Sequence, residues 1–323
     1  MYFPYLRGKQ FELIALRDMS VFIKDINLIS PIIEPVRTTT ATLFRTLEDL
    51  KNNGFNFNII LNPHDGEIKR TNGYASFIDD LIKKIGGYSN YQPSFIINRN
   101  TDIDNIVDVI NSYSLKNISL IISGIPESNK LLDLFSISGC VVRYAALYDD
   151  SSVRRLSRSI GGKCENLILF ADRFLSKARN VDYLQAEDEE FTDDHLFYKS
   201  EGYCGFSDFA TIGKGFSESG FLPYAIAIHL TYLSKEQKIR IHHFVSDSND
   251  DTDNTAGKLG EALDKLVPFV DRENIHTQAS EQFRKIKTDG SYPGLGVIKK
   301  ISILNHIEVV YNYLSNELLH KSL

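Results

Sequence analysis

Eight short apolar runs, several of them rich in β-branched residues, recur along the first two thirds of the chain, and most are followed by a stretch with helical periodicity. The eight runs are residues 2–7, 30–36, 57–63, 94–99, 118–124, 141–147, 167–172 and 205–213. Between them, apolar residues recur three and four positions apart, and several stretches end at Gly or Asn, as helices commonly do. This alternation predicts a parallel sheet with right-handed helical crossovers.

An eightfold count favours a closed α/β barrel of the TIM-like (β/α)8 type, which typically occupies about 200 to 250 residues. An open doubly wound sheet is the alternative. It needs no eightfold count, and it usually carries a glycine-rich phosphate turn after its first strand. Here that turn contains one glycine, Gly8. We therefore predict a (β/α)8 barrel over residues 1–215.

The pattern changes after Gly213. Residues 223–234 and 238–248 are separated by the short polar segment KEQ, which predicts an antiparallel β-hairpin. Helical stretches follow at about 257–268, 279–287 and 297–319. We expect residues 216–323 to be a hairpin and helical elaboration packed on the barrel, without forming an independent domain. One alternative stays open, in which this hairpin supplies the last barrel strand.

Composition narrows the class of protein. The chain is 42% hydrophobic and 24% charged, which is typical of a folded domain. Its formal charge of -6 argues against a surface built as a whole for nucleic acid, so any anion site must be local. The three cysteines lack CxxC spacing, and neither a signal-peptide pattern nor an apolar run of about 20 residues is present. We expect a cytoplasmic protein without a membrane segment.

Polar residues at the ends of the predicted strands are the candidate site, because barrel enzymes carry their chemistry at the carboxyl ends of the strands. Glu34 interrupts the apolar run 31–36, where a charge is costly to bury unless it is paired or functional. With Asp172 and Asp208 at the last two strand ends, it could supply a general base or ligands for a divalent metal ion. These three are the predicted catalytic residues.

Cations at the same ends predict an anion site. Arg7 and Lys9 follow the first strand, and Asn98 and Arg99 follow the fourth. Together they could bind a phosphate, a nucleotide or a carboxylate. The alternative is that Arg7 pairs with a neighbouring carboxylate such as Glu34 and ties two strands together. His64 lies within NPHDG, a sequence typical of a turn.

Two further features indicate a structural role and not a functional site. His242 and His243 are adjacent on a predicted strand, so they should point to opposite faces and cannot bind one metal ion together. The acidic run 187–194 is expected to be a loop, and with the C-terminal helices it could form the surface of a homo-oligomer.

The segments PYLRGKQFELIAL and ISPIIEPV resemble the opening of an uncharacterised bacterial family that begins with PYLRGKQFE, and are more distantly similar to the bacteriophage beta-protein family. The positions that carry the likeness are Pro4, Arg7, Lys9, Glu12, Ala15, Leu16, Pro31 and Glu34. Later segments at 205–209 and 294–308 extend it along the chain. The resemblance implies a barrel-like fold, phage-related or anti-phage defence loci, and a nuclease-like partner encoded by a neighbouring gene.

Two functions follow as expectations. The first is an enzyme that processes a phosphate ester bound at the barrel mouth. The second is a non-catalytic partner or sensor subunit that binds a nuclease-like protein. Carboxylates that converge on an open mouth would favour the first, and carboxylates that are all held in buried pairs would favour the second. The sequence contains no recognisable nucleophile, metal motif or cofactor loop that decides between them.

Overall fold

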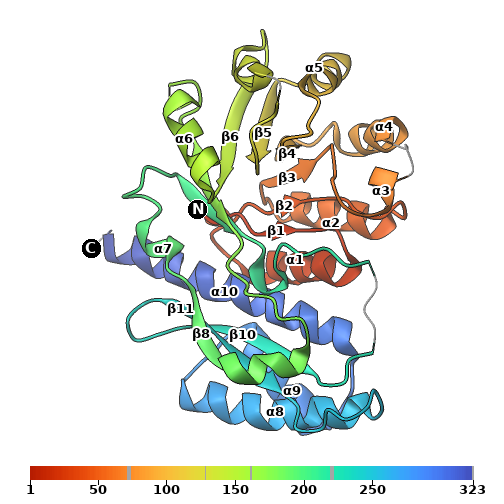
Figure 1. Cartoon of the computed structure of the whole chain (residues 1–323), viewed down its shortest axis with the longest axis vertical. Helices are drawn as coiled ribbons and strands as arrows, with labels where there is room; N and C mark the ends of the chain where they lie inside the picture. Colours follow the sequence, from red (N-terminus) through yellow and green to blue (C-terminus); the bar gives the residue numbers. More distant parts are fainter. Residues whose placement is uncertain (71–73, 128, 161, 219–221, 322–323) are drawn as a thin grey trace. The chain divides into compact units, whose positions relative to one another are not determined.

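The computed structural model describes residues 1–70, 74–127, 129–160, 162–218 and 222–321, and it contains the predicted parallel sheet (Figure 1). Eight strands follow one another in the order β1-β2-β3-β4-β5-β6-β7-β9, each parallel to its neighbour. Their bounds are β1 (Tyr5–Leu6), β2 (Ile32–Ile33), β3 (Phe57–Ile60), β4 (Tyr91–Ile97), β5 (Asn117–Ile122), β6 (Val141–Tyr148), β7 (Leu167–Ala171) and β9 (Gly205–Asp208). Each of the eight predicted runs overlaps one of these strands.

The two ends of this sheet meet at the N-terminus. Tyr2 forms parallel bridges with both Ile29 and Phe206. The backbone N–H of Phe3 donates to the Phe206 carbonyl over 2.8 Å, and the N–H of Phe206 donates to the Met1 carbonyl over 3.1 Å. The sheet is therefore nearly closed into a barrel, and the predicted (β/α)8 class is confirmed. The hairpin does not supply a barrel strand.

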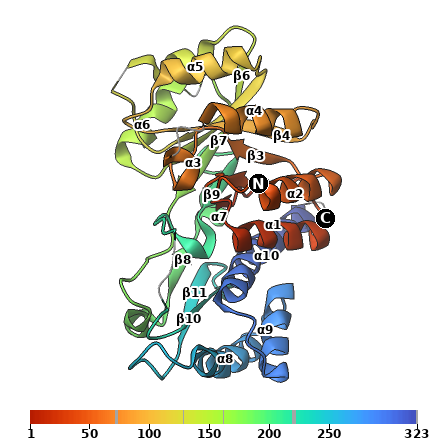
Figure 2. The same ribbon diagram turned by 90° about the vertical axis from the view of Figure 1, so that its right-hand side faces the viewer.

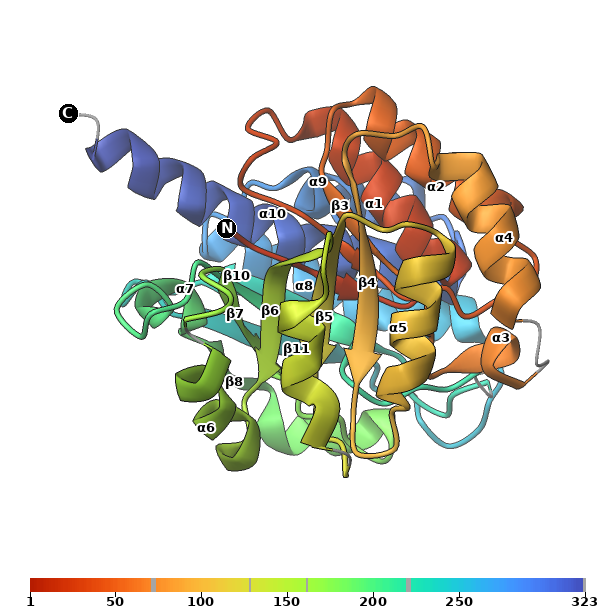
Figure 3. The same cartoon turned by 90° about the horizontal axis from the view of Figure 1, so that it is seen from above.

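Helices follow the barrel strands and cover their outer side, as α2, α4 and α5 show in Figure 3. They are α2 (Ala41–Asn52), α3 (Gly66–Arg70), α4 (Tyr74–Ile85), α5 (Ile103–Ser112), the 3₁₀ helix η1 (Asn129–Ser136), α6 (Ser151–Ile160) and α7 (Asp194–Phe197). On α5, Ile103, Ile106 and Ile110 are buried, a spacing that places them on one helical face. The side chain of Asp102 caps this helix by accepting the N–H groups of Asp104 and Asn105.

The chain divides into two compact units. The first, which holds the barrel strands, consists of Met1–Leu13, Lys24–Ala171 and Asp194–Asp208. The second consists of Ile14–Ile23, Asp172–Asp193 and Phe209–Leu323. Helix α1 (Gln10–Phe22) contributes to both. The second unit therefore includes residues 14–23 and 172–193 in addition to the C-terminal region.

A three-stranded antiparallel sheet, in the order β10-β11-β8, forms the centre of the second unit. The unit contains the 3₁₀ helices η2 (Asn180–Ala186) and η3 (Ala210–Ile212), β8 (Asp188–Thr192), β10 (Ala227–Leu233), β11 (Ile239–Val245), α8 (Thr255–Arg272), α9 (Gln278–Asp289) and α10 (Leu295–Lys321). Phe269 of α8 packs on His242 and Phe244, while Asn305 of α10 donates to the Thr231 carbonyl. Helix α9 packs against both α8 and α10 (Figure 2). The predicted hairpin and three helices are confirmed.

The acidic run 187–194 is not a loop, contrary to the prediction. It contains β8, which pairs with β11 so that Asp188 lies opposite His242 and Thr192 opposite Ile239. Basic side chains of β11 and its turn offset the acidic side chains of β8. Arg240 Nε donates to Asp188 Oδ1 over 2.6 Å, and Lys238 Nζ donates to Glu190 Oε2 over 2.9 Å. Within the described residues, no helix is long and apolar enough to cross a membrane.

Candidate functional site

Glu34 follows β2 and is 2% exposed. Its Oε2 accepts the Tyr5 hydroxyl over 2.7 Å, and its Oε1 accepts the backbone N–H groups of His64 (2.6 Å) and Asp65 (3.1 Å). Burial raises the pKa of Glu34, and the hydrogen bond from Tyr5 opposes that rise. Both carboxylate oxygens are thus occupied, and Glu34 holds the loop after β3 against β1 and β2.

Arg7, at the end of β1, is 4% exposed and is committed to a carboxylate. Its Nε donates to Asp65 Oδ2 over 3.0 Å, while its backbone N–H donates to Glu12 Oε2 over 2.7 Å. Arg7 therefore pairs with a neighbouring carboxylate, as in the alternative predicted from the sequence, but this carboxylate belongs to Asp65 and not to Glu34. Since Asp65 also donates its N–H to Glu34, the structure joins Arg7 and Glu34 in one network through Asp65.

The other two predicted catalytic carboxylates are held by different groups. Asp208, at the end of β9 in the first unit, is 1% exposed and accepts the Tyr2 hydroxyl over 2.7 Å. Burial, and then the charge of Asp208, raise the pKa of Tyr2. Asp172 belongs to the second unit, where it accepts the backbone N–H groups of Phe174 (3.2 Å) and Lys214 (2.9 Å). Each of the three carboxylates has its own set of donors.

The remaining predicted ligand residues are more accessible. Lys9 is half-buried just before α1, and Arg99 is exposed after β4. The charge of Arg99 contributes, after hydrogen bonds from Ser152, to the lowered pKa of Asp150. Asn98 has the most defined role, because its amide Nδ2 lies 2.8 Å from Nδ1 of His64.

Asn98 fixes which nitrogen of His64 carries the proton. Its Oδ1 accepts the backbone N–H of Asn100 over 2.9 Å, so its Nδ2 must be the atom that faces the imidazole. An amide nitrogen can only donate, and His64 Nδ1 therefore accepts. Burial lowers the pKa of His64, and the charge of Lys69 lowers it further, which keeps the ring neutral at pH 7. The proton then resides on Nε2, which makes no hydrogen bond within the described part of the chain.

His64 lines a cavity of about 470 Å³ formed by α4, α5 and the loops after β3 and β4. Its polar wall includes Asn62, His64, Lys69, Asn100, Thr101 and Asn105, and its apolar wall includes Leu61, Ile78, Phe95, Ile106 and Val109. Asn62 is already bonded to the backbone of Ile96, and Asp102 is occupied as the cap of α5. Among the lining residues that the structure describes, the polar groups left for a ligand are His64 Nε2, Lys69 and the side-chain amides of Asn100 and Asn105.

Sequence reasoning predicted Asn98 as a ligand residue but placed His64 in an ordinary turn, and it missed Lys69, Asn100 and Asn105. The signal was weak, because NPHDG reads as a turn and Lys69 lies inside a helix of five residues, α3. Among the residues that the structure describes, no group of three or more His, Cys, Asp or Glu side chains is placed to hold a metal ion. The comparisons with protein-family models, with curated proteins and with solved structures found no match.

Proposed function

We propose that the barrel binds a small anionic ligand of the phosphate-ester class in the cavity between α4 and α5. One observation carries this proposal: Asn98 fixes His64 as a neutral ring with an Nε2–H donor, beside Lys69 in the same cavity. A fixed N–H donor and a cation are the groups that recognise a phosphate oxygen. The volume lies within the range usual for small-molecule sites, about 300 to 1,000 Å³.

Binding without catalysis is the favoured form of this function. Glu34 and Asp208 are nearly inaccessible, and each accepts a buried tyrosine hydroxyl. A general base must reach the substrate proton, so these carboxylates support the barrel from within. Arg7, paired with Asp65, orders the same loop that carries His64.

A partner or sensor subunit is therefore the role that we propose for the whole chain. The further expectation, a phage-related or defence locus with a nuclease-like partner, has the resemblance of PYLRGKQFE as its support. The ligand-binding proposal does not depend on it.

Calorimetric titration with inorganic phosphate and with adenosine monophosphate tests the site. We expect both to bind, and we expect Lys69→Met to weaken binding by about tenfold or more, since a charged hydrogen bond contributes about 1.5 to 3 kcal/mol. Lys83→Met is the matched control, because Lys83 is exposed on α4 and does not line the cavity. The proposal fails if neither anion binds at millimolar concentration, or if both variants weaken binding equally.

A further inference from the structure

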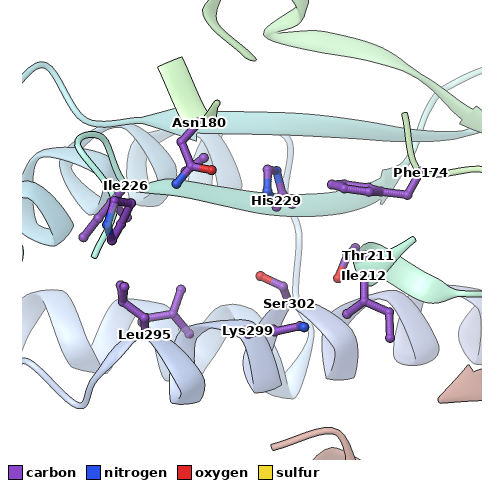
Figure 4. A pocket seen from close by; sticks show the side chains of 12 residues that line it. Phe174, Asn180, Thr211, Ile212, Ile226, His229, Leu295, Lys299 and Ser302 are labelled. Carbon is purple, nitrogen blue, oxygen red and sulfur yellow. The ribbon is translucent and has the colours of Figure 1, made fainter. Parts of the chain in front are cut away.

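We propose a second ligand site, in the second unit, for a small uncharged cyclic amide such as a pyrimidine base. The site is a cavity of about 280 Å³ between β10, the 3₁₀ helices η2 and η3, and α10 (Figure 4). Its polar lining includes His229, Thr211 and Ser302, together with Asn180 and Lys299. Phe174, Ile226 and Leu295 supply apolar walls. This inference is independent of the anion site in the barrel, which belongs to the other unit.

Three residues in series decide the protonation of His229. Nε2 of His243 lies 3.2 Å from Glu189 Oε1, and Nδ1 of His243 lies 2.7 Å from Nδ1 of His229. A carboxylate accepts, so His243 carries its proton on Nε2 and its Nδ1 accepts in turn. His229 must then donate from Nδ1, which leaves its Nε2 with an unprotonated lone pair. The series Glu189–His243–His229 thus presents a hydrogen-bond acceptor to the cavity.

Burial keeps the imidazoles of His229 and His243 neutral. It lowers the pKa of His229 to about 3, with a smaller contribution from His243, and it lowers the pKa of His243 against the opposing effect of Glu189. Aromatic rings surround His229, whose centroid lies 5.0 Å from that of Phe174 and 4.7 Å from that of Tyr183. At neutral pH the Nε2 lone pair of His229 can therefore accept a hydrogen bond from a ligand donor.

Thr211 gives an independent indication of a ligand. It is 5% exposed, and its Oγ1 is buried without a hydrogen-bond partner. A buried hydroxyl without a partner is costly, and such groups in native proteins call for an explanation. A ligand acceptor in the cavity that Thr211 lines would provide one. His229 therefore calls for a ligand donor, and the Thr211 hydroxyl can donate to an acceptor on the same molecule.

Charge and shape select the class of molecule. Among the described residues that line the cavity, none is Asp or Glu and one is Lys299, which disfavours a cation. The neutral His229, with Glu189 behind His243, disfavours an anionic group at that end. The apolar walls and the ring of Phe174 suit a flat, uncharged ring. A volume just below the usual range for small-molecule sites favours a single base over a nucleotide.

Titration with uracil, followed by calorimetry and by imidazole ¹⁵N spectra of the full chain, tests the site. We expect uracil to bind and to change the ¹⁵N chemical shift of the unprotonated nitrogen of His229. 1,3-Dimethyluracil keeps both carbonyls but has no N–H donor, and it should bind about tenfold more weakly or not at all. No binding of uracil, equal binding of both compounds, or a proton on Nε2 of His229 would each overturn the proposal.

Two variants complete the test. Thr211→Val removes the unpartnered hydroxyl, so it should weaken uracil binding about tenfold without lowering the thermal midpoint. His276→Gln removes an exposed histidine outside the cavity and should change neither. If Thr211→Val binds uracil as the parent chain does, the hydroxyl is not part of a site and the assignment is wrong.

Discussion

A single buried carboxylate orders much of the barrel mouth, because Glu34 accepts one hydroxyl and two backbone N–H groups. Glu34→Ala would remove the acceptor that these three donors share, and the loss of an acceptor by a buried donor costs about 1 to 3 kcal/mol. We expect a loss of about 3 kcal/mol or more in the free energy of unfolding, measured by urea denaturation. Glu34→Gln keeps an acceptor oxygen and should cost much less. Equal losses for the two variants would contradict the role of Glu34 as an acceptor.

A substitution at Asn98 can change which ring nitrogen of His64 carries the proton. Asn98→Asp replaces the donor that faces Nδ1 with a carboxylate, which can only accept. In the neutral ring the proton should move to Nδ1, from which it can be donated to the carboxylate. We expect imidazole ¹⁵N spectra to show the changed tautomer, and phosphate binding to fall because Nε2 no longer donates at neutral pH. A variant that keeps the proton on Nε2 would contradict the assigned hydrogen bond.

Elements of the barrel meet closely where the loop after β2 crosses the start of α3. Gly66 has φ of +81°, and a Cβ there would lie 2.2 Å from the Val36 carbonyl oxygen. Gly66→Ala must therefore displace backbone as well as strain φ, and we expect a loss of about 3 kcal/mol or more. Gly139→Ala is the matched control, with φ of +77° and nothing within 4 Å of the added Cβ.

That control should cost about 1 kcal/mol, the penalty for a left-handed alanine alone. Urea denaturation of the two variants gives the comparison. If Gly66→Ala is no more destabilising than Gly139→Ala, the contact between these two elements is looser than described.

The barrel strands could be predicted because most of their own residues are apolar, as in Phe57–Ile60 and Leu167–Ala171. Strand β8 could not, since Asp188, Glu189 and Glu190 have no strand propensity. It forms because β11 supplies Arg240 and the turn before it supplies Lys238, and no local pattern contains that information.

The same limit applies to the candidate sites. The partner of Arg7 is 58 residues away, and only the fold brings Asp65 to it. The prediction that His242 and His243 point to opposite faces is confirmed, because His242 packs on Phe269 and His243 on His229. The partner of His243 could not be predicted from the sequence, since the pairing of β10 with β11 decides that His229 lies opposite His243.

At the scale of the whole molecule, His229 makes stability depend on pH. Its pKa is about 3 in the folded chain, against an ordinary value of 6.5, so the unfolded chain binds a proton that the folded chain does not. The stability contribution is fully present above pH 6.5 and is lost as the pH falls toward 3. The slope from this one group is at most about 1.4 kcal/mol per pH unit. Charged or titratable groups that act on the His229–His243 pair include Glu189, Lys177 and Lys299.

His229→Gln removes this proton site, so urea denaturation between pH 4.5 and 7.5 should give a flatter stability profile for the variant than for the parent chain. The two profiles should be parallel above pH 6.5 and should converge below it, since other groups that titrate in acid are common to both chains. His276→Gln, at an exposed loop position, should follow the parent profile throughout. Profiles that stay parallel down to pH 4.5 would mean that His229 binds a proton in the folded chain as readily as in the unfolded chain, and the assignment of a neutral His229 beside His243 would then be wrong.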